Sequence, residues 1–199
     1  MINIQGKLDR EVYVGCSGGV DSMAIVDFLS RKHKVNIVFF DHGNDLAKDE
    51  KEFVLDYFKN RDVKLHLGEI TRDKLKGESQ EEYWRNERYK FFKSFNADII
   101  TCHHLNDCVE TWVWSSLHGN GKIIPYRNEN VIRPFRLTEK NDFLNWCRTK
   151  NVPWIEDSSN SDIKYMRNFI RHEIMPKALV VNPGLNKVVI KKVKEDGHY

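Results

Sequence analysis

One short segment, Ser17–Ser22 (S-G-G-V-D-S), restricts the possible folds of this chain more than any other. It follows the apolar run Val12–Val14 and precedes a segment, Met23–Leu29, whose apolar residues recur at helical spacing. Glycines at such a turn adopt backbone conformations closed to other residues and let an anion approach the main chain. The first amides of a helix also favour negative charge. The segment therefore predicts a strand, a phosphate-binding loop and a helix.

The side chains of this loop agree with a phosphate ligand. Ser17 and Ser22 add hydroxyl donors to the backbone of Gly18, Gly19 and Val20, and Asp21 stands where it can bind a magnesium ion that bridges phosphates. The alternative is a glycine turn capped by Ser17 and Asp21, as in many helices. We favour phosphate because the hexapeptide falls at the first strand–helix turn of an α/β pattern. No GKS or GKT follows, which excludes the other common phosphate loop.

The rest of the chain alternates between strand-like and helix-like segments. This alternation predicts an α/β fold, a Rossmann-like parallel sheet with helices on both faces. The expected strands are 12–14, 35–40, 63–67, 98–102 and 131–132, and the expected helices are 23–29, 47–60, 79–95, 106–117, 141–150 and 165–175.

We expect residues 1–137 to form the catalytic domain and residues 138–199 to form a small helical C-terminal extension packed on it. The tail from about Lys187 is basic, and we expect it to be loosely ordered.

The composition excludes several classes of protein. The net charge of +3 is only a weak indication of a polyanionic partner. The four cysteines form no CxxC pair, which argues against a zinc site and fits free thiols in a reducing compartment. No window approaches the roughly 18 apolar residues that span a bilayer. The sequence predicts a soluble, cytoplasmic protein with no membrane partner.

The hexapeptide resembles the signature of the N-type ATP pyrophosphatases, or PP-loop enzymes. The resemblance implies an adenine nucleotide alpha hydrolase-like fold, and ATP and Mg²⁺ bound by Ser17–Ser22, with Asp21 the catalytic and metal-binding residue. It further implies that a substrate oxygen attacks the α-phosphate, that pyrophosphate leaves, and that the adenylated carbon then accepts a nitrogen or sulfur nucleophile.

Four further segments resemble, in order and spacing, the tRNA(Ile)-lysidine synthetases. They are His42-Gly43, the stretch from Glu81 to Tyr89, the stretch from Cys102 to Thr111, and the stretch from Ile132 to Arg171. The resemblance spans roughly residues 11–183. It implies that ATP, contacted also by His42, adenylates C2 of the wobble cytidine in tRNA(Ile) with a CAU anticodon, and that free L-lysine then displaces AMP.

Asp107 and Glu110 lie three residues apart near a predicted helix start, hence on one face. Two carboxylates there can hold the cationic lysine, take its proton or share Mg²⁺. The alternative is a solvated acidic pair favoured by the helix dipole. With the neighbouring His103, His104 and Thr111, we favour the catalytic interpretation.

Other polar residues are candidates for contacts with substrate or tRNA. His103 and His104 end a predicted strand over the nucleotide site, and a structural hydrogen bond is the alternative for one of them. Arg85 and Arg88 lie on adjacent turns of one helix and suit phosphate, with ion pairs to Glu81 or Glu82 as the alternative. A third set of candidates is Arg167, Asn168 and Arg171. These residues either contact the tRNA backbone or order the loop 157–160.

The chain departs from this family's pattern in three places. Asn106 stands where Asp is frequent, and His118 opens a segment where Arg-Gly-x-Gly is usual. The sequence also ends soon after Pro183, so we expect a short form without C-terminal tRNA-binding domains, in which the catalytic domain, the tail or a homodimer holds the tRNA. Two other functions stay open: a PP-loop enzyme adenylating a different tRNA base or a small molecule, and a nucleotide-binding module without turnover.

Overall fold

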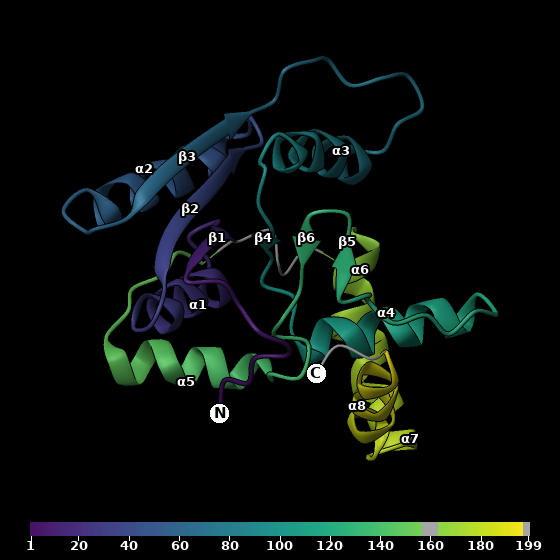
Figure 1. Cartoon of the computed structure of the whole chain (residues 1–199). Coiled ribbons are helices and arrows are strands. Elements are labelled where there is room, and N and C mark those ends of the chain that lie inside the picture. Colours follow the sequence, from purple (N-terminus) through teal and green to yellow (C-terminus); the bar gives the residue numbers. More distant parts are fainter. Residues whose placement is uncertain (157–162, 197–199) are drawn as a thin grey trace.

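The computed structural model describes residues 1–156 and 163–196. Figure 1 shows a twisted sheet with helices packed around it. The strand order is β3-β2-β1-β4-β6-β5, and every neighbouring pair is parallel except β5 and β6. The strands are β1 (Glu11–Gly15), β2 (Lys34–Asp41), β3 (Lys64–Glu69), β4 (Ile99–Ile100), β5 (Arg127–Asn128) and β6 (Val131–Ile132).

The predicted Rossmann-like α/β fold is confirmed, since helices cover both faces of this sheet. The first helices are α1 (Val20–Ser30), α2 (Asp45–Phe58), α3 (Gln80–Lys93), α4 (Leu105–Leu117) and α5 (Lys140–Lys150). Alternate residues of β2 separate the two faces: Ile37 packs in the cluster that contains α1 and α5 side chains, whereas Val38 packs in the cluster with Phe92 of α3. The antiparallel strand β5 was not predicted.

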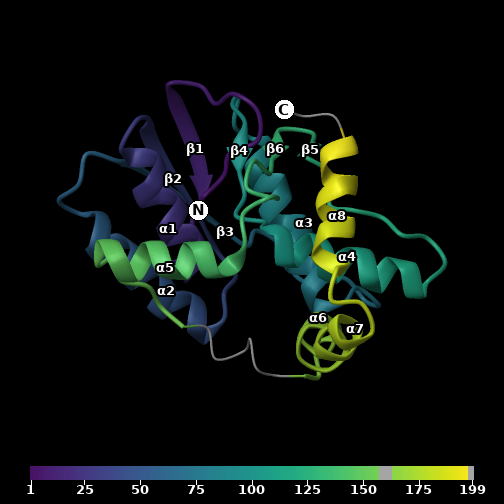
Figure 2. The ribbon, with the colours of Figure 1, turned by 90° about the horizontal axis from the view of Figure 1, so that it is seen from below.

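The predicted helix 165–175 is three consecutive pieces: α6 (Met166–Phe169), a π-helical stretch η2 (Ile170–Ile174) and α7 (Met175–Val181). Pro176 stands in the first turn of α7 and has no N–H to donate, so it interrupts the hydrogen-bond ladder where η2 meets α7. Figure 2 shows these pieces beside α4, away from α5. The loop 157–160 named above lies outside the described residues.

The expectation of a loosely ordered tail is wrong over residues 185–195, which form helix α8 (Leu185–Glu195). Leu185, Val189 and Val193 recur every four residues, are buried, and pack against Val109 and Val113 of α4. Burial of this apolar stripe outweighs the repulsion among the lysines. Lys187, Lys191 and Lys194 are exposed, and Lys192 lies over the Trp112 ring of α4. The spacing of these apolar residues was present in the sequence, but the lysines among them led to the prediction of a loosely ordered tail.

A buried arginine fastens the C-terminal helix to the N-terminal strand region. Arg136 is fully buried and donates to Gln5 Oε1 (3.2 Å), to the carbonyl of Ile124 (2.8 Å) and to Asp196 Oδ2 (2.7 Å). A buried charge is tolerated only when it is paired and hydrogen-bonded in this way. Helix α5 packs against α1, and α8 packs against α4. The division of the chain into two domains at residue 137 stays a prediction.

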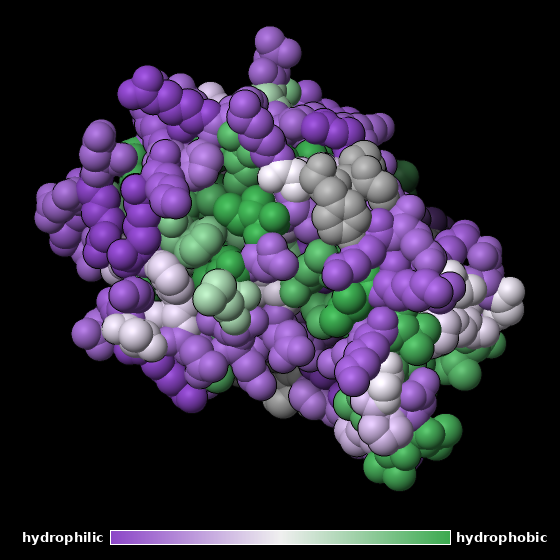
Figure 3. Space-filling model, turned by 60° about the horizontal axis from the view of Figure 1, so that its bottom comes forward, coloured by the Kyte–Doolittle hydropathy of each residue, from purple (hydrophilic) through white to green (hydrophobic). Residues whose placement is uncertain are grey.

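No helix in the described ranges has both the length and the apolar character needed to cross a bilayer. The surface in Figure 3 is mainly hydrophilic, interrupted by hydrophobic patches.

Candidate functional site

A cavity of about 310 Å³ lies at the carboxyl ends of β1 and β4. The chain leaves β1 towards β2 on one side, and β4 lies on the other, so this is the point where the strand order reverses. Ligands of open α/β sheets bind in the crevice at such a point. Three parts of the chain line the cavity: the loop after β1, the segment Thr101–His103 after β4, and side chains from α2, α3, α4 and α6.

The loop Ser17–Ser22 forms the predicted turn from strand to helix. Gly18 has φ +84°, and a side chain there would lie 3.1 Å from the Phe53 ring, so glycine is required. The Gly18 carbonyl accepts from the Ile155 amide (2.9 Å), which fixes the loop from outside. Ser17, Gly19, Asp21 and Ser22 line the cavity.

The N-terminus of α1 lacks a side-chain cap, because Gly19 occupies the N-cap position. In contrast, Asn44, Ser79 and His104 cap α2, α3 and α4 through side-chain acceptors. The first amides of α1 therefore offer hydrogen bonds and a positive dipole end to the cavity. This arrangement suits an anion such as phosphate.

Asp21 supplies the one carboxylate of this loop. Its Oδ1 is buried and has no hydrogen-bond partner among the described residues, while Oδ2 lies 3.6 Å from His104 Nε2 and 4.0 Å from Lys140 Nζ. An unpartnered carboxylate oxygen beside a phosphate-binding loop fits a Mg²⁺ ion, which is bound by one or two carboxylates together with substrate phosphates. The described residues contain no cluster of three or more metal-ligating side chains, so the phosphates would supply the remaining ligands.

His104 has a structural position rather than a place in the cavity lining. It is buried at the N-cap of α4, where its Nδ1 accepts from the Asp107 amide (3.3 Å) and its own amide donates to Asp107 Oδ2 (3.0 Å). Because Nδ1 accepts a hydrogen bond, the neutral ring carries its proton on Nε2, which faces Asp21. His104 thereby links the loop to α4.

His103 lines the cavity, and its Nδ1 lies 3.0 Å from the Thr101 hydroxyl. Burial, reinforced by nearby guanidinium groups, lowers the pKa of His103 to about 3. Burial and the charge of Arg88 likewise lower the pKa of His42 to about 4. Both rings are neutral at pH 7, and His42 Nδ1 is buried without a hydrogen-bond partner among the described residues. His42 lines the cavity together with Val38 and Phe40.

The carboxylates of Asp107 and Glu110 lie on one face of α4, as the spacing predicted, and both are buried. Two arginines bind them. Arg167 Nη2 donates to Asp107 Oδ1 (2.8 Å), and Arg171 donates to both oxygens of Glu110 (2.8 and 3.1 Å). Although burial raises the pKa of Asp107, His104 and Arg167 outweigh it and hold that pKa below its ordinary value.

The two arginines of α3 lie differently. Arg88 lines the cavity and has no carboxylate partner among the described residues, and burial lowers the pKa of its guanidinium. Arg85 is exposed, and its guanidinium stacks over the Tyr89 ring. Two other candidates, Thr111 (half-buried) and Asn168 (buried), are not among the residues that line the cavity.

Several residues at the site were not identified from the sequence, among them Glu50, which lines the cavity from α2. Thr101 lines the cavity and contacts His103, and Lys140 approaches Asp21 from the start of α5. Thr101 directly follows the β4 strand, and this position at a strand's carboxyl end is the signal that would have found it. Lys140 has no such signal, because its approach depends on the tertiary packing of α5.

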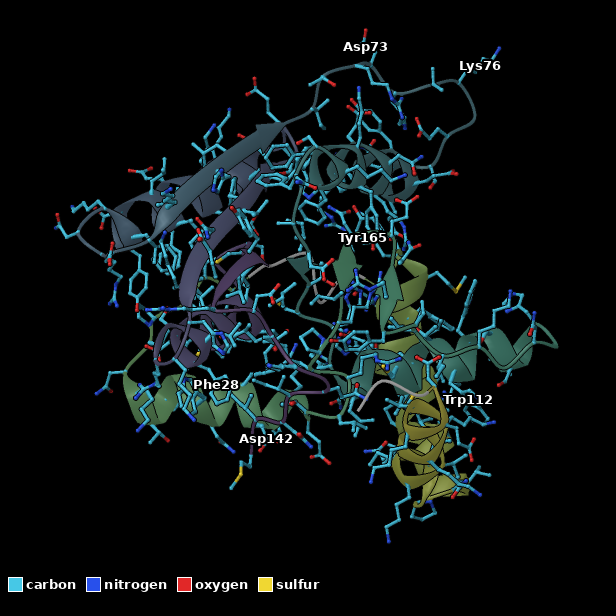
Figure 4. All side chains as sticks on the ribbon, viewed as in Figure 1. Phe28, Asp73, Lys76, Trp112, Asp142 and Tyr165 are labelled. Atoms are coloured by element: carbon cyan, nitrogen blue, oxygen red, sulfur yellow. The ribbon has the colours of Figure 1, made fainter. Side chains whose placement is uncertain are left out.

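Figure 4 shows where the long loop between β3 and α3 lies. Asp73 and Lys76 project at its far edge, remote from α4 and α5. Arg72 fastens the base of this loop through Glu78 (2.8 Å) and Glu87 (3.0 Å). The loop tip thus takes no part in the cavity.

Curated relatives resemble the chain over nearly its whole length. It is 32% identical over 92% of its length to a tRNA(Ile)-lysidine synthase of Thermotoga sp. (strain RQ2), and 32% identical over 96% to one of Thermosipho africanus. A tRNA(Ile)-lysidine synthase of Haemophilus ducreyi is 30% identical over 92% of the chain. The chain spans about half the length of these relatives: 49%, 49% and 45%.

The family assignment depends on a match to a family model that covers the residues around the cavity. The family model described as the PP-loop domain matches residues 2–178, from the segment before β1 to α7. The phosphate loop, the carboxylates of α4 and both arginines of the C-terminal helices fall within that match. The chain therefore belongs to the PP-loop family.

Proposed function

We propose that this chain is a lysidine-forming ligase: it uses ATP to join L-lysine to C2 of the wobble cytidine of tRNA(Ile) with a CAU anticodon, releasing AMP and pyrophosphate. The observation that carries the proposal is that Asp107, which stands beside Glu110 on α4, lines the same cavity as the uncapped, anion-binding terminus of α1. The relatives named tRNA(Ile)-lysidine synthase support the choice of acceptor and of amine.

The phosphate side of the cavity would bind ATP. The free amides of α1 and the hydroxyl of Ser17 would hold the β- and γ-phosphates, and Arg88 would neutralise charge on the leaving pyrophosphate. The Ser22 hydroxyl donates to the Gly19 carbonyl (2.9 Å) and so holds the shape of the loop. Asp21 would hold Mg²⁺, which supplies charge neutralisation at the phosphates when it is bound. The neutral His42, beside Val38 and Phe40, would lie against the adenine.

In the first step the C2 carbonyl oxygen of cytidine would attack the α-phosphate, forming the new P–O bond as the bond to pyrophosphate breaks. In the second step the lysine amine would attack C2, and AMP would leave with the oxygen. The amine must lose a proton in this step, and Asp107 or Glu110 is the nearest group of this chain that could accept it.

We further propose a cytoplasmic location and, with α8 and its lysines exposed beside α4, contact of the tRNA backbone with this side of the molecule. A homodimer stays a prediction.

The test is incorporation of radiolabelled lysine into purified tRNA(Ile) with a CAU anticodon, with and without ATP. ATP-dependent label confined to that tRNA is the expected result, and tRNA with a CAU anticodon that accepts methionine is the control. AMP release with another acceptor, and no lysine incorporation, would contradict the lysidine assignment and leave adenylation. Release of AMP under no condition would favour a nucleotide-binding module.

A further inference from the structure

The pair of carboxylates assigned to the amine is already occupied by cations of the protein itself. Arg167 and Arg171 bring two positive charges to the two negative charges of Asp107 and Glu110. An incoming ammonium group would make this cluster net positive, and the two like charges of the guanidinium groups disfavour that. The amine can therefore bind well only when one guanidinium leaves.

The two arginines are held unequally. Arg171 is 22% exposed and binds both oxygens of Glu110, with a third contact to Asp107 Oδ1 (3.4 Å). Arg167 is 52% exposed and makes one close bond, to Asp107, with Glu110 at 3.9 Å. A half-exposed ion pair contributes little stability, whereas a bidentate, mostly buried one is strong. Arg167 is the guanidinium that can leave.

Arg167 also faces the phosphate side of the cavity. It lines the same cavity as Ser17, Gly19 and Asp21, and its charge contributes to lowering the pKa of Arg88. A triphosphate bound at the loop Ser17–Ser22 would place several negative charges in that cavity, whose lining includes Arg167. Arg167 thus has two alternative anionic partners, one on each side.

The local backbone sets this arrangement. Arg167 lies in the short α6 and Arg171 in the π-helical stretch η2, four residues later, so both project towards α4. A π-helical stretch is rare, weakens the regular ladder and is frequent at functional sites. The short helix that carries Arg167 is therefore continued by a stretch that rearranges more easily than a regular α-helix.

We propose that Arg167 couples the two halves of the cavity: without nucleotide it occupies Asp107, and a bound triphosphate draws it away and opens Asp107 to the amine. This inference rests on the proposed function, because it takes the amine site from there. ATP would then bind first and strengthen lysine binding, and by reciprocity lysine would strengthen nucleotide binding by the same factor. Arg167 is in this sense a positioning residue, and Arg171 stays on Glu110 throughout.

The test is calorimetric titration of L-lysine into the intact chain, with and without Mg²⁺ and α,β-methylene-ATP, whose α–β linkage cannot be cleaved. In the wild type we expect the nucleotide to tighten lysine binding roughly tenfold, within the usual range of coupling between sites. In Arg167→Ala we expect equal lysine affinity with and without nucleotide, and tighter binding than the nucleotide-free wild type. Lys177→Ala removes one exposed positive charge from α7 and should behave as the wild type.

Two results would overturn the proposal: full coupling retained in Arg167→Ala, or a wild type that binds lysine equally in both conditions. If neither protein binds lysine in any condition, the amine site itself is wrong and the coupling fails with it. That failure is distinguishable, because binding is then absent rather than uncoupled. Far-ultraviolet circular dichroism of each variant establishes that it is folded.

Discussion

The two halves of the cavity are prepared in opposite ways. On the phosphate side, the amides of α1, the guanidinium of Arg88 and Asp21 Oδ1 all lack partners within the described protein. On the carboxylate side, every charge of Asp107 and Glu110 is already matched by an arginine. The phosphate side is therefore preorganised for its ligand, whereas the carboxylate side must release an arginine before it can bind an amine.

The largest expected effect on activity comes from replacing Asp21 on the phosphate side. We expect Asp21→Ala to lower AMP formation in the presence of ATP, tRNA and lysine by about 10³-fold, because removal of one preorganised charge-stabilising group has effects of this size. The exposed Asp56→Ala, which removes a carboxylate from α2, is the matched control and should keep wild-type turnover. A wild-type rate in Asp21→Ala would refute the metal-binding assignment.

The carboxylate half is tested by Glu110→Gln. Loss of one charge leaves Arg171 without its bidentate partner and weakens the amine site, so we expect KM for lysine to rise about 30-fold while KM for ATP changes little. Steady-state kinetics with each substrate varied in turn measures both constants. Equal effects on the two would show that the halves are not separate.

The packing of α8 on α4 supports the carboxylate half of the cavity, and the unfolding free energies of two variants test it. Val189 is fully buried between α8 and α4, the helix that bears both carboxylates, whereas Val188 on the same helix is 39% exposed. We expect Val189→Ala to cost about 2 kcal/mol of unfolding free energy and Val188→Ala under about 0.5 kcal/mol. Urea unfolding measures both, and equal losses would contradict the packing of α8.

The last prediction is a pH dependence of stability that arises on the phosphate side. The pKa of His42 falls to about 4 in the folded chain from an ordinary 6.5, so below pH 6.5 the unfolded state binds the proton more readily. Stability therefore falls as pH drops from about 6.5 to 4, with a slope of up to about 1.4 kcal/mol per pH unit from this group. In His42→Gln that part of the slope should vanish; unfolding curves across this range decide it.

The sequence was informative wherever a pattern is local. The loop, the strand–helix alternation and the Asp107–Glu110 spacing each depend on neighbours within a few residues, and each lies where it was expected. The partners of the carboxylates were not predictable in the same way, because Arg167 and Arg171 meet them across about 60 residues through the packing of α4, α6 and η2. Tertiary contacts of this kind leave no period in the sequence.

Helix α8 was missed for another reason. Its apolar stripe has the right period, but a lysine-rich segment has weak helical stability alone and folds only when α4 provides a surface. The capping role of His104 was likewise one of two open interpretations, and only the observed bond between its Nδ1 and the Asp107 amide distinguishes them.

The bonds of Arg136 have a consequence for biosynthesis. Gln5 precedes Arg136 by 131 residues and Asp196 follows it by 60, yet both meet the same guanidinium. At synthesis rates of roughly 5–20 residues per second, Asp196 follows Arg136 by roughly 3–12 s. For that interval the nascent chain carries an arginine that is buried in the finished fold but does not yet have its counterion.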